Sequence, residues 1–204
     1  MPSVTQAVEH AMPWEKSFDE EAALEKAMHV FWSKGYDSAS MAELIEETGV
    51  NRGSLYNAFG GKKPLFVRAL LKYDRDWRKA TFAELEALDD PRRAISDFFD
   101  NIVADTVADT ERKGCFLFNT VLASSAHDAE TNAIVANGLR EIEGFFRRSI
   151  EVGQARGDIR KDIDPAAKAK ALLALALAVR VLGRGPYAAS ALRTIADEAK
   201  KLIA

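Results

Sequence analysis

The stretch SMAELIEETGVNRGSLYNAFGGKK, residues 40–63, decides the fold of this chain. It predicts two short helices joined by a tight turn. Ser40 followed by Glu43 is a capping box, so the first helix begins there. Gly49 ends it in the left-handed conformation that glycine adopts at least cost, and Asn51 is a favourable N-cap for the second helix. A helix-turn-helix with a polar second helix fits the major groove of DNA.

The second helix of this pair is predicted to turn a polar face outward. Leu55 and Phe59 are spaced to face the core, and Gly53 allows a close approach to a groove. The other outward side chains suit a base edge or a phosphate. Ser40 and Asn51 are further candidates, although helix capping alone accounts for both and is the stronger interpretation. The candidate DNA-binding residues of the second helix are Arg52, Gly53, Ser54, Tyr56 and Asn57.

The bulk composition is that of an ordinary globular protein. Of the 204 residues, 48% are hydrophobic and 29% are charged, which allows one or two domains with a substantial core. The single Cys115 excludes an intramolecular disulfide and a zinc site built on several cysteines. Residues 171–179, the longest apolar run, are too few to span a bilayer, and the start does not resemble a secretory leader. We expect a cytoplasmic protein with no membrane partner, no metal and no cofactor.

Positive charge is concentrated just after the helix-turn-helix. Residues 1–60 hold ten acidic and four basic residues, a net charge of −6, whereas residues 61–80 hold two acidic and seven basic residues, a net charge of +5. The overall charge of −3 therefore conceals a segment that is suited to phosphates. We assign Lys62 and Lys63 to phosphate contact and interpret the more distal arginines as a solvated helix face.

The hydrophobic periodicity predicts an all-α chain of about nine helices, three in the N-terminal domain and the rest in a bundle. A long helix is expected from Pro64 to about Leu88. The segment 114–123 has a strand-like composition, but no partner strand is predicted, so we expect a short buried helix. The predicted regions are a flexible N-terminal arm at 1–17, a helix-turn-helix domain at 18–62, and a ligand-binding and dimerisation domain at 63–204.

Several motifs between Ala23 and Tyr73 occur in the order and spacing of a known family. They are a Gly-Tyr pair after the first helix, the run Gly-Val-x-Arg-Gly-Ser-Leu-Tyr, and a Phe-x-x-Lys element that leads into a long helix. This block resembles the DNA-binding domain of the tetracycline-repressor (TetR/AcrR) family of bacterial transcriptional regulators. The resemblance implies contacts near the DNA backbone for Tyr56 and Lys62. Ala39 stands where many relatives have threonine, and the arm lacks their arginines, so minor-groove reading by the arm is not expected.

The resemblance also implies what the regulator does. It predicts a repressor that binds a palindromic operator in double-stranded DNA as a homodimer and is released by an unknown small-molecule effector. The candidate ligand-binding residues are Trp77, Phe98, Phe99, Asn119 and Phe145. The alternative is that the aromatic residues are simple core and that the backbone satisfies Asn119.

Cys115 offers a competing mode of regulation. It follows Arg112 and Lys113, and nearby positive charge raises the thiolate fraction of a cysteine. A redox- or electrophile-sensing regulator acting through Cys115 is therefore the alternative function. A buried and inert cysteine is the stronger interpretation, because its neighbours are apolar.

The last two predicted helices, Pro165–Gly183 and Ala189–Ile203, are candidates for a dimer interface. The first is apolar on nearly every side, which is more than one face of a small bundle can bury. A four-helix bundle with a second copy of the chain would cover this surface. The candidate interface residues are Leu172, Leu175, Val179, Leu192, Ile195 and Ala199.

An enzyme is the hypothesis from a different class. His10, His29 and His127 are scattered, no paired carboxylate–histidine spacing recurs, and no glycine loop suited to a phosphate is present. We therefore predict that the chain is not an enzyme. A helical interaction protein that uses the same domain without DNA is a third possibility.

Overall fold

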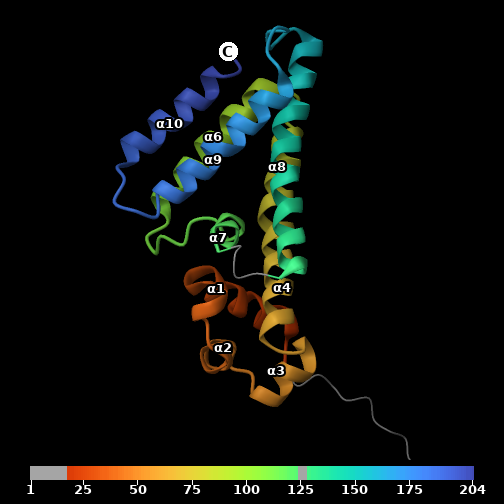
Figure 1. Ribbon diagram of the computed structural model, residues 1–204, viewed down its shortest axis with the longest axis vertical. Coiled ribbons are helices and arrows are strands. Elements are labelled where there is room, and N and C mark those ends of the chain that lie inside the picture. The colour runs from red at the N-terminus through yellow and green to blue at the C-terminus, as the bar shows by residue number, and fades with distance from the viewer. Residues whose placement is uncertain (1–17, 124–127) are drawn as a thin grey trace, which may run out of the picture.

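The computed structural model describes residues 18–123 and 128–204, and this part of the chain contains helices and no strands. The predicted arm at 1–17 and His127 lie outside the described residues. The molecule is elongated, with a small three-helix head at one end and a helical bundle at the other (Figure 1). The prediction of an all-α fold is therefore confirmed.

The described residues form ten α-helices and one π-helical segment, together with the segments that connect them. α4, η1 and α5 follow one another without a break and form one rod, so the number of separate helices agrees with the predicted nine. The elements are α1 (Glu20–Ser38), α2 (Met41–Thr48), α3 (Arg52–Phe59), α4 (Lys62–Tyr73), η1 (Asp74–Lys79), α5 (Ala80–Glu86), α6 (Pro91–Ala108), α7 (Phe116–Leu122), α8 (Ala129–Arg156), α9 (Pro165–Leu182) and α10 (Ala189–Lys201).

The head consists of α1, α2 and α3, and the start and end of α2 and the start of α3 are where the sequence predicts them. Asp19 caps α1 by accepting the backbone N–H groups of the first turn. Gly49 ends α2 in the left-handed conformation, with φ of 70°, and the Asn51 side chain caps α3. Gly35, with φ of 78°, interrupts the helical conformation of α1 one turn before its end.

The rod α4–η1–α5 joins the head to the bundle (Figure 1). Its first half packs against α1, where Phe66 meets Phe31 edge to face at 5.2 Å between ring centroids. Its second half packs against α6. Inside η1 the side chains of Asp74 and Arg78, both 9% exposed, form a buried ion pair.

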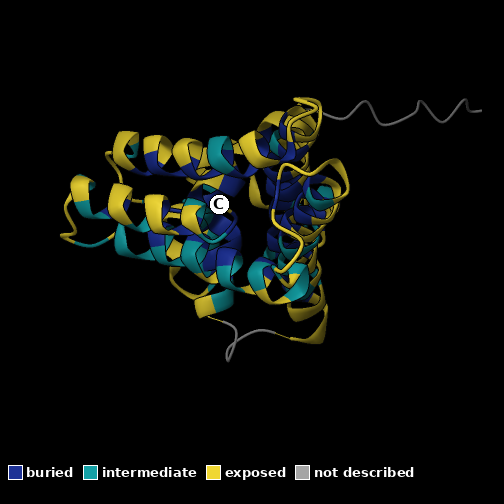
Figure 2. Ribbon diagram, turned by 90° about the horizontal axis from the view of Figure 1, so that it is seen from above, coloured by how far each residue is buried: buried dark blue, intermediate teal, exposed yellow. Residues whose placement is uncertain are grey.

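The bundle is built around the long helix α8, which packs against α6 and α9, while α10 covers α6 and α9 from the other side. Seen from above, buried residues line the inward faces of these helices and exposed residues their outer faces (Figure 2). The segment predicted as a short buried helix is α7, and Phe116, Leu117 and Phe118 are each at most 4% exposed.

α7 approaches α8 closely because a glycine lies beneath it. A Cβ atom added to Gly138 in the middle of α8 would lie 2.7 Å from Leu117 Cδ2. Leu117 is itself 2% exposed and cannot move aside freely. Gly144, on the same helix, faces only the far end of the Arg148 side chain.

The predicted dimer-interface residues need correction. Leu172, Val179, Leu192 and Ala199 are at most 2% exposed and pack inside the protomer, because they form the faces that α9 and α10 turn toward the rest of the bundle. Leu175 and Ile195 are half-buried. The sequence pattern predicts that the most apolar residues contact a second copy of the chain. In the structure, the partly exposed stripe of α9 consists mainly of smaller side chains. This stripe comprises Ala167, Ala171, Ala174, Leu177, Ala178 and Val181.

The Ser40–Glu43 capping box is confirmed and is joined to α1. The Glu43 carboxylate accepts the Ser40 backbone N–H at 2.9 Å, and Ser40 Oγ accepts the Glu43 backbone N–H at 3.2 Å. The Lys34 ammonium also pairs with Glu43. The hydrogen bond from Lys34, followed by those from Ser40, lowers the pKa of Glu43 from its ordinary value of 4.5 to about 2.

Gly138→Ala is expected to destabilise the protein, although alanine favours a helix. Overpacking against Leu117 costs about 1–3 kcal/mol, and the gain in helix propensity is about 1 kcal/mol. Gly144→Ala is the matched control and should stabilise by up to about 1 kcal/mol, since it meets no fixed neighbour. Urea unfolding at a fixed protein concentration measures both. If Gly138→Ala and Gly144→Ala change the free energy of unfolding equally and in the same direction, the close approach of α7 to Gly138 would be contradicted.

Glu43→Gln is expected to remove part of the acid sensitivity of the head. A carboxyl whose pKa is lowered on folding stabilises the folded state fully above pH 4.5 and loses that contribution as the pH falls toward 2. The difference in melting temperature between wild type and variant should therefore be largest near neutral pH and shrink below pH 4.5. Glu46→Gln, an exposed position on the same helix, is the control. A difference independent of pH would argue against the paired carboxylate.

Candidate nucleic-acid interface and effector cavity

α3 lies at the end of the molecule farthest from the bundle (Figure 1). Leu55 and Phe59 anchor it, at 1% and 4% exposed. The opposite face is largely exposed, so it has the shape and chemistry that a recognition helix needs. Of the predicted DNA-binding residues on α3, Ser54 is half-buried and the exposed ones are Arg52, Gly53, Tyr56 and Asn57.

The two predicted residues at helix starts act as caps. Asn51 Oδ1 accepts the Ser54 backbone N–H at 2.9 Å, and Ser40 belongs to the capping box. Both are exposed. Their side-chain oxygens therefore cap the first turns of α2 and α3. This agrees with helix capping, the stronger interpretation of the sequence.

The N-terminus of α4 lies next to α3. Tyr56 packs on Gly61, whose added Cβ would be 3.3 Å from the Tyr56 ring, and Gly61 also has a positive φ of 118°. No side chain caps α4, so its first N–H groups remain available to an anion. Lys62 begins this helix, and its Nζ lies 4.5 Å from the centroid of the Tyr36 ring.

Lys63 does not point toward the same surface, which corrects its assignment to a phosphate. Its Nζ lies 2.9 Å from Asp128 Oδ2 and also donates to the Thr131 hydroxyl. Asp128 is the N-cap of α8, and the hydrogen bonds from the Thr131 backbone and from Lys63 lower its pKa to about 2. Lys63 therefore ties the start of the rod to the N-terminus of α8, where the capping carboxylate offers it an ion pair.

A cavity of about 280 Å³ lies between the rod and helices α6 to α9. Trp77 and Phe98 line it, as predicted, and so does Cys115. Phe99 and Phe145 do not line it: both are fully buried, and Phe145 stacks behind the wall on Phe82 at 4.6 Å between centroids.

Several of the polar groups at this cavity are paired with one another. Arg180 Nη2 lies 3.0 Å from an Asp105 oxygen. The Tyr73 hydroxyl donates to Cys115 Sγ at 3.4 Å. Burial, and then the neighbouring Cys115, raises the pKa of Tyr73 well above its ordinary value, so this hydroxyl remains a donor near neutral pH.

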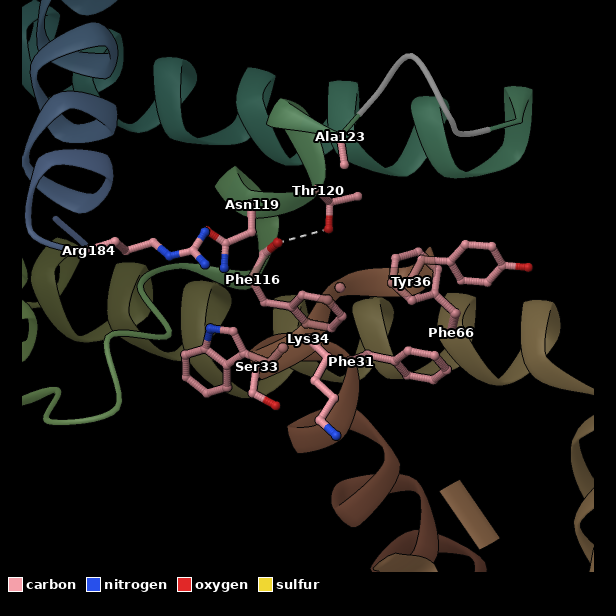
Figure 3. Close-up of a pocket in the computed structure, with 12 residues that line it drawn as sticks. Phe31, Ser33, Lys34, Tyr36, Phe66, Phe116, Asn119, Thr120, Ala123 and Arg184 are labelled. Carbon is pink, nitrogen blue, oxygen red and sulfur yellow. Dashed lines mark hydrogen bonds between the residues drawn. The ribbon is translucent and has the colours of Figure 1, made fainter. Parts of the chain in front are cut away.

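Asn119 lies in a different and smaller cavity, of about 160 Å³, between α1 and α7. Its amide donates to the Lys113 carbonyl at 2.6 Å and accepts from Arg184 at 2.8 Å. Figure 3 shows Arg184 reaching toward Asn119 at one edge of this cavity, with Tyr36 from the head on another side. Because protein groups satisfy the Asn119 side chain, its conformation needs no ligand.

Trp32 connects the head to the cavity wall. Its indole N–H donates to the Gly114 carbonyl at 3.0 Å, and its ring meets Tyr73 at 5.0 Å and Trp77 at 5.9 Å between centroids. Sequence reasoning missed Trp32, Tyr73 and Arg180 as functional candidates. Their partners lie far away along the chain, and no local pattern signals such contacts.

Other kinds of site are not evident in the part of the chain that the structure describes. There, no three His, Cys, Asp or Glu side chains gather into a cluster that could hold a metal ion. No helix of residues 18–123 and 128–204 is long and apolar enough to cross a membrane.

Comparison with known sequences and structures places the chain in a family. The sequence model described as "Bacterial regulatory proteins, tetR family" matches residues 23–69. The model described as "Tetracyclin repressor-like, C-terminal domain" matches residues 91–195. The chain is 32% identical over 168 residues to the transcriptional repressor ComR of Escherichia coli K12, covering 78% of this chain and 77% of ComR. It is 30% identical to the uncharacterized regulator YezE of Bacillus subtilis 168, covering 77% of this chain and 81% of YezE.

A solved structure agrees with these sequence matches. The TetR family regulator CifR, as a cysteine mutant complexed with 26bp double-strand operator DNA, superposes with a TM-score of 0.82 at 26% identity. The superposition covers 94% of this chain and all of that one. The exposed α3, its caps and the helical bundle therefore belong to a DNA-binding transcriptional regulator of the TetR family of bacterial regulatory proteins.

Proposed function

We propose that the protein is a cytoplasmic repressor that binds a near-palindromic operator as a homodimer and is released by a small apolar or amphipathic molecule. The observation that carries this proposal is the exposed, capped α3 beside the uncapped N-terminus of α4. ComR is named a repressor, and CifR is described on operator DNA, which supports the same role here. One recognition helix covers too few base pairs to specify a genomic site, so two copies are needed.

The proposed DNA contacts fall into two classes. Arg52, Ser54 and Asn57 read bases, and Gly53 lets α3 approach them. Tyr56 and Lys62 contact the backbone, together with the first N–H groups of α2 at Ser40 and of α3 at Asn51. We propose residues 18–62 as the DNA-binding domain and 63–204 as the effector and dimerisation domain.

Release requires the effector to change the position of the head. The Trp32 contacts give a route, because Tyr73 and Trp77 line the cavity and touch a helix of the head. The ligand must favour the conformation that does not bind DNA by ~1–3 kcal/mol. The alternative, that oxidation or alkylation of Cys115 releases the DNA, draws support from the position of its thiol on the same cavity. The redox alternative requires the thiol, whereas release by a noncovalent ligand does not. Cys115→Ser should therefore leave release by such a ligand intact.

Lys62→Ala is expected to weaken operator binding evenly across sequences and to reduce the slope of log affinity against log salt by roughly one unit. Asn57→Ala should instead lower discrimination between operator variants, by about 1–3 kcal/mol at one position. Gel-shift titrations with the DNA upstream of the gene, at several salt concentrations, measure both. Lys26→Ala, an exposed lysine on α1, is the control. An unchanged slope for Lys62→Ala would show that Lys62 does not touch the DNA backbone.

Ala174→Glu is expected to yield monomers that bind the operator much more weakly. Ala174 is exposed on the apolar stripe of α9, so glutamate is tolerated in the protomer but would bury a charge against a second copy. Thr194→Glu, at an exposed polar position on α10, should remain dimeric. Analytical ultracentrifugation at micromolar concentration decides. A monomeric wild type, or a dimeric Ala174→Glu, would contradict dimerisation through this face.

A further inference from the structure

The Tyr73 hydroxyl is a buried donor with a poor acceptor. Tyr73 is 8% exposed. Its hydroxyl donates to Cys115 Sγ at 3.4 Å. A thiol sulfur is a weak acceptor, whereas a buried tyrosine hydroxyl normally has a strong partner. An oxygen acceptor entering the cavity would therefore give this hydroxyl a better hydrogen bond than the protein does.

Four of the five charged side chains that line the cavity are paired with one another. Arg78 Nη2 lies 2.7 Å from Asp74 Oδ2 in a pair that is almost completely buried. Arg180 is paired with Asp105, and Glu84, the remaining charged residue of the lining, is exposed. A charged ligand would lose its hydration without gaining a free counter-charge, or would have to break one of these pairs. The cavity therefore favours a neutral molecule.

The aromatic walls of the cavity favour a flat ligand. Much of the apolar lining is aromatic, and aromatic faces and edges pack well against a flat π-system. The volume of about 280 Å³ is just below the usual range for ligand cavities, ~300–1,000 Å³, which suits a small ligand of one or two fused rings. The aromatic lining residues are Tyr73, Trp77, Phe82, Phe98 and Phe118.

We propose that this cavity takes a neutral, planar aromatic molecule that carries a carbonyl oxygen, and that the Tyr73 hydroxyl donates to that oxygen. The inference rests on the proposed function, because it names the chemical class of the effector. It also makes Tyr73 the residue that distinguishes a ketone from a hydrocarbon of the same shape. Since Tyr73 contacts Trp32 of the head, the polar anchor of the ligand lies at the contact between cavity and head.

Three compounds of nearly equal size and shape test the proposal by isothermal titration calorimetry against the full-length protein without DNA. Acetylnaphthalene has the neutral carbonyl, isopropenylnaphthalene lacks the acceptor, and naphthoate carries a negative charge. Acetylnaphthalene should bind at least about tenfold more tightly than either of the others, which is the effect of one good hydrogen bond or of one unpaired buried charge.

Tyr73→Phe isolates the hydroxyl. The variant should bind isopropenylnaphthalene as wild type does, which shows that the cavity is intact, and should lose the roughly tenfold preference for acetylnaphthalene. Tyr187→Phe removes a hydroxyl from an exposed tyrosine and should keep the preference.

Several results would overturn the proposal: no binding of acetylnaphthalene to wild type, equal affinity for the ketone and the hydrocarbon, tighter binding of naphthoate, or an unchanged preference in Tyr73→Phe. These measurements use no DNA, so they are independent of operator recognition. Failure of the ligand-free protein to bind its upstream DNA would instead contradict the proposed function and leave the calorimetric result standing.

Discussion

The rod α4–η1–α5 packs in two hydrophobic cores at once, that of the head and that of the bundle. The rest of the structure depends on this constraint. In its α4 half, Phe66 packs between Phe31 of the head and Phe116 of α7, at centroid distances of 5.2 and 5.7 Å. In its η1 and α5 half, the same rod forms one wall of the cavity of about 280 Å³. Packed protein interiors have few ways to rearrange, so a displacement of either half is transmitted to the other.

The π-helical segment η1 lies at the point where the rod passes from one core to the other. A π segment widens one turn of the helix, and such segments occur frequently at functional sites. Here the widened turn accommodates the buried Asp74–Arg78 pair and brings Trp77 to the cavity beside Tyr73. Lys72, just before it, pairs with Glu21 of α1 and with Asp76, so the same turn is also held to the head.

Features set by local chemistry could be predicted from the sequence. The caps of α2 and α3 and the glycine that ends α2 depend on residues within four positions of one another, and all are confirmed. Helix periodicity separated buried from exposed residues on α3 for the same reason. DNA-binding roles for its outward residues follow from position and family, and they remain predictions.

Features set by contacts between distant residues could not be predicted in this way. Lys63 pairs with Asp128, which is 65 positions away, and no local pattern indicates this. Leu172 and Leu192 are as apolar as an interface residue would be, yet they pack in the protomer, because periodicity shows that a face is buried but not against which neighbour. The cavity was predicted from aromatic content alone, and the structure separates Trp77 and Phe98, which line it, from Phe99, which does not.

The outward face of α3 has one more consequence, which concerns how such a regulator changes over evolutionary time. Arg52 and Asn57 are exposed, and substitutions at exposed positions usually alter stability little. If these side chains read the operator as proposed, operator preference can change at little cost in stability. The cavity wall is different, because Phe82 and Phe98 are each 7% exposed and belong to the core. If the cavity binds the effector as proposed, a lineage that acquires a new effector repacks that core, whereas a lineage that acquires a new operator does not.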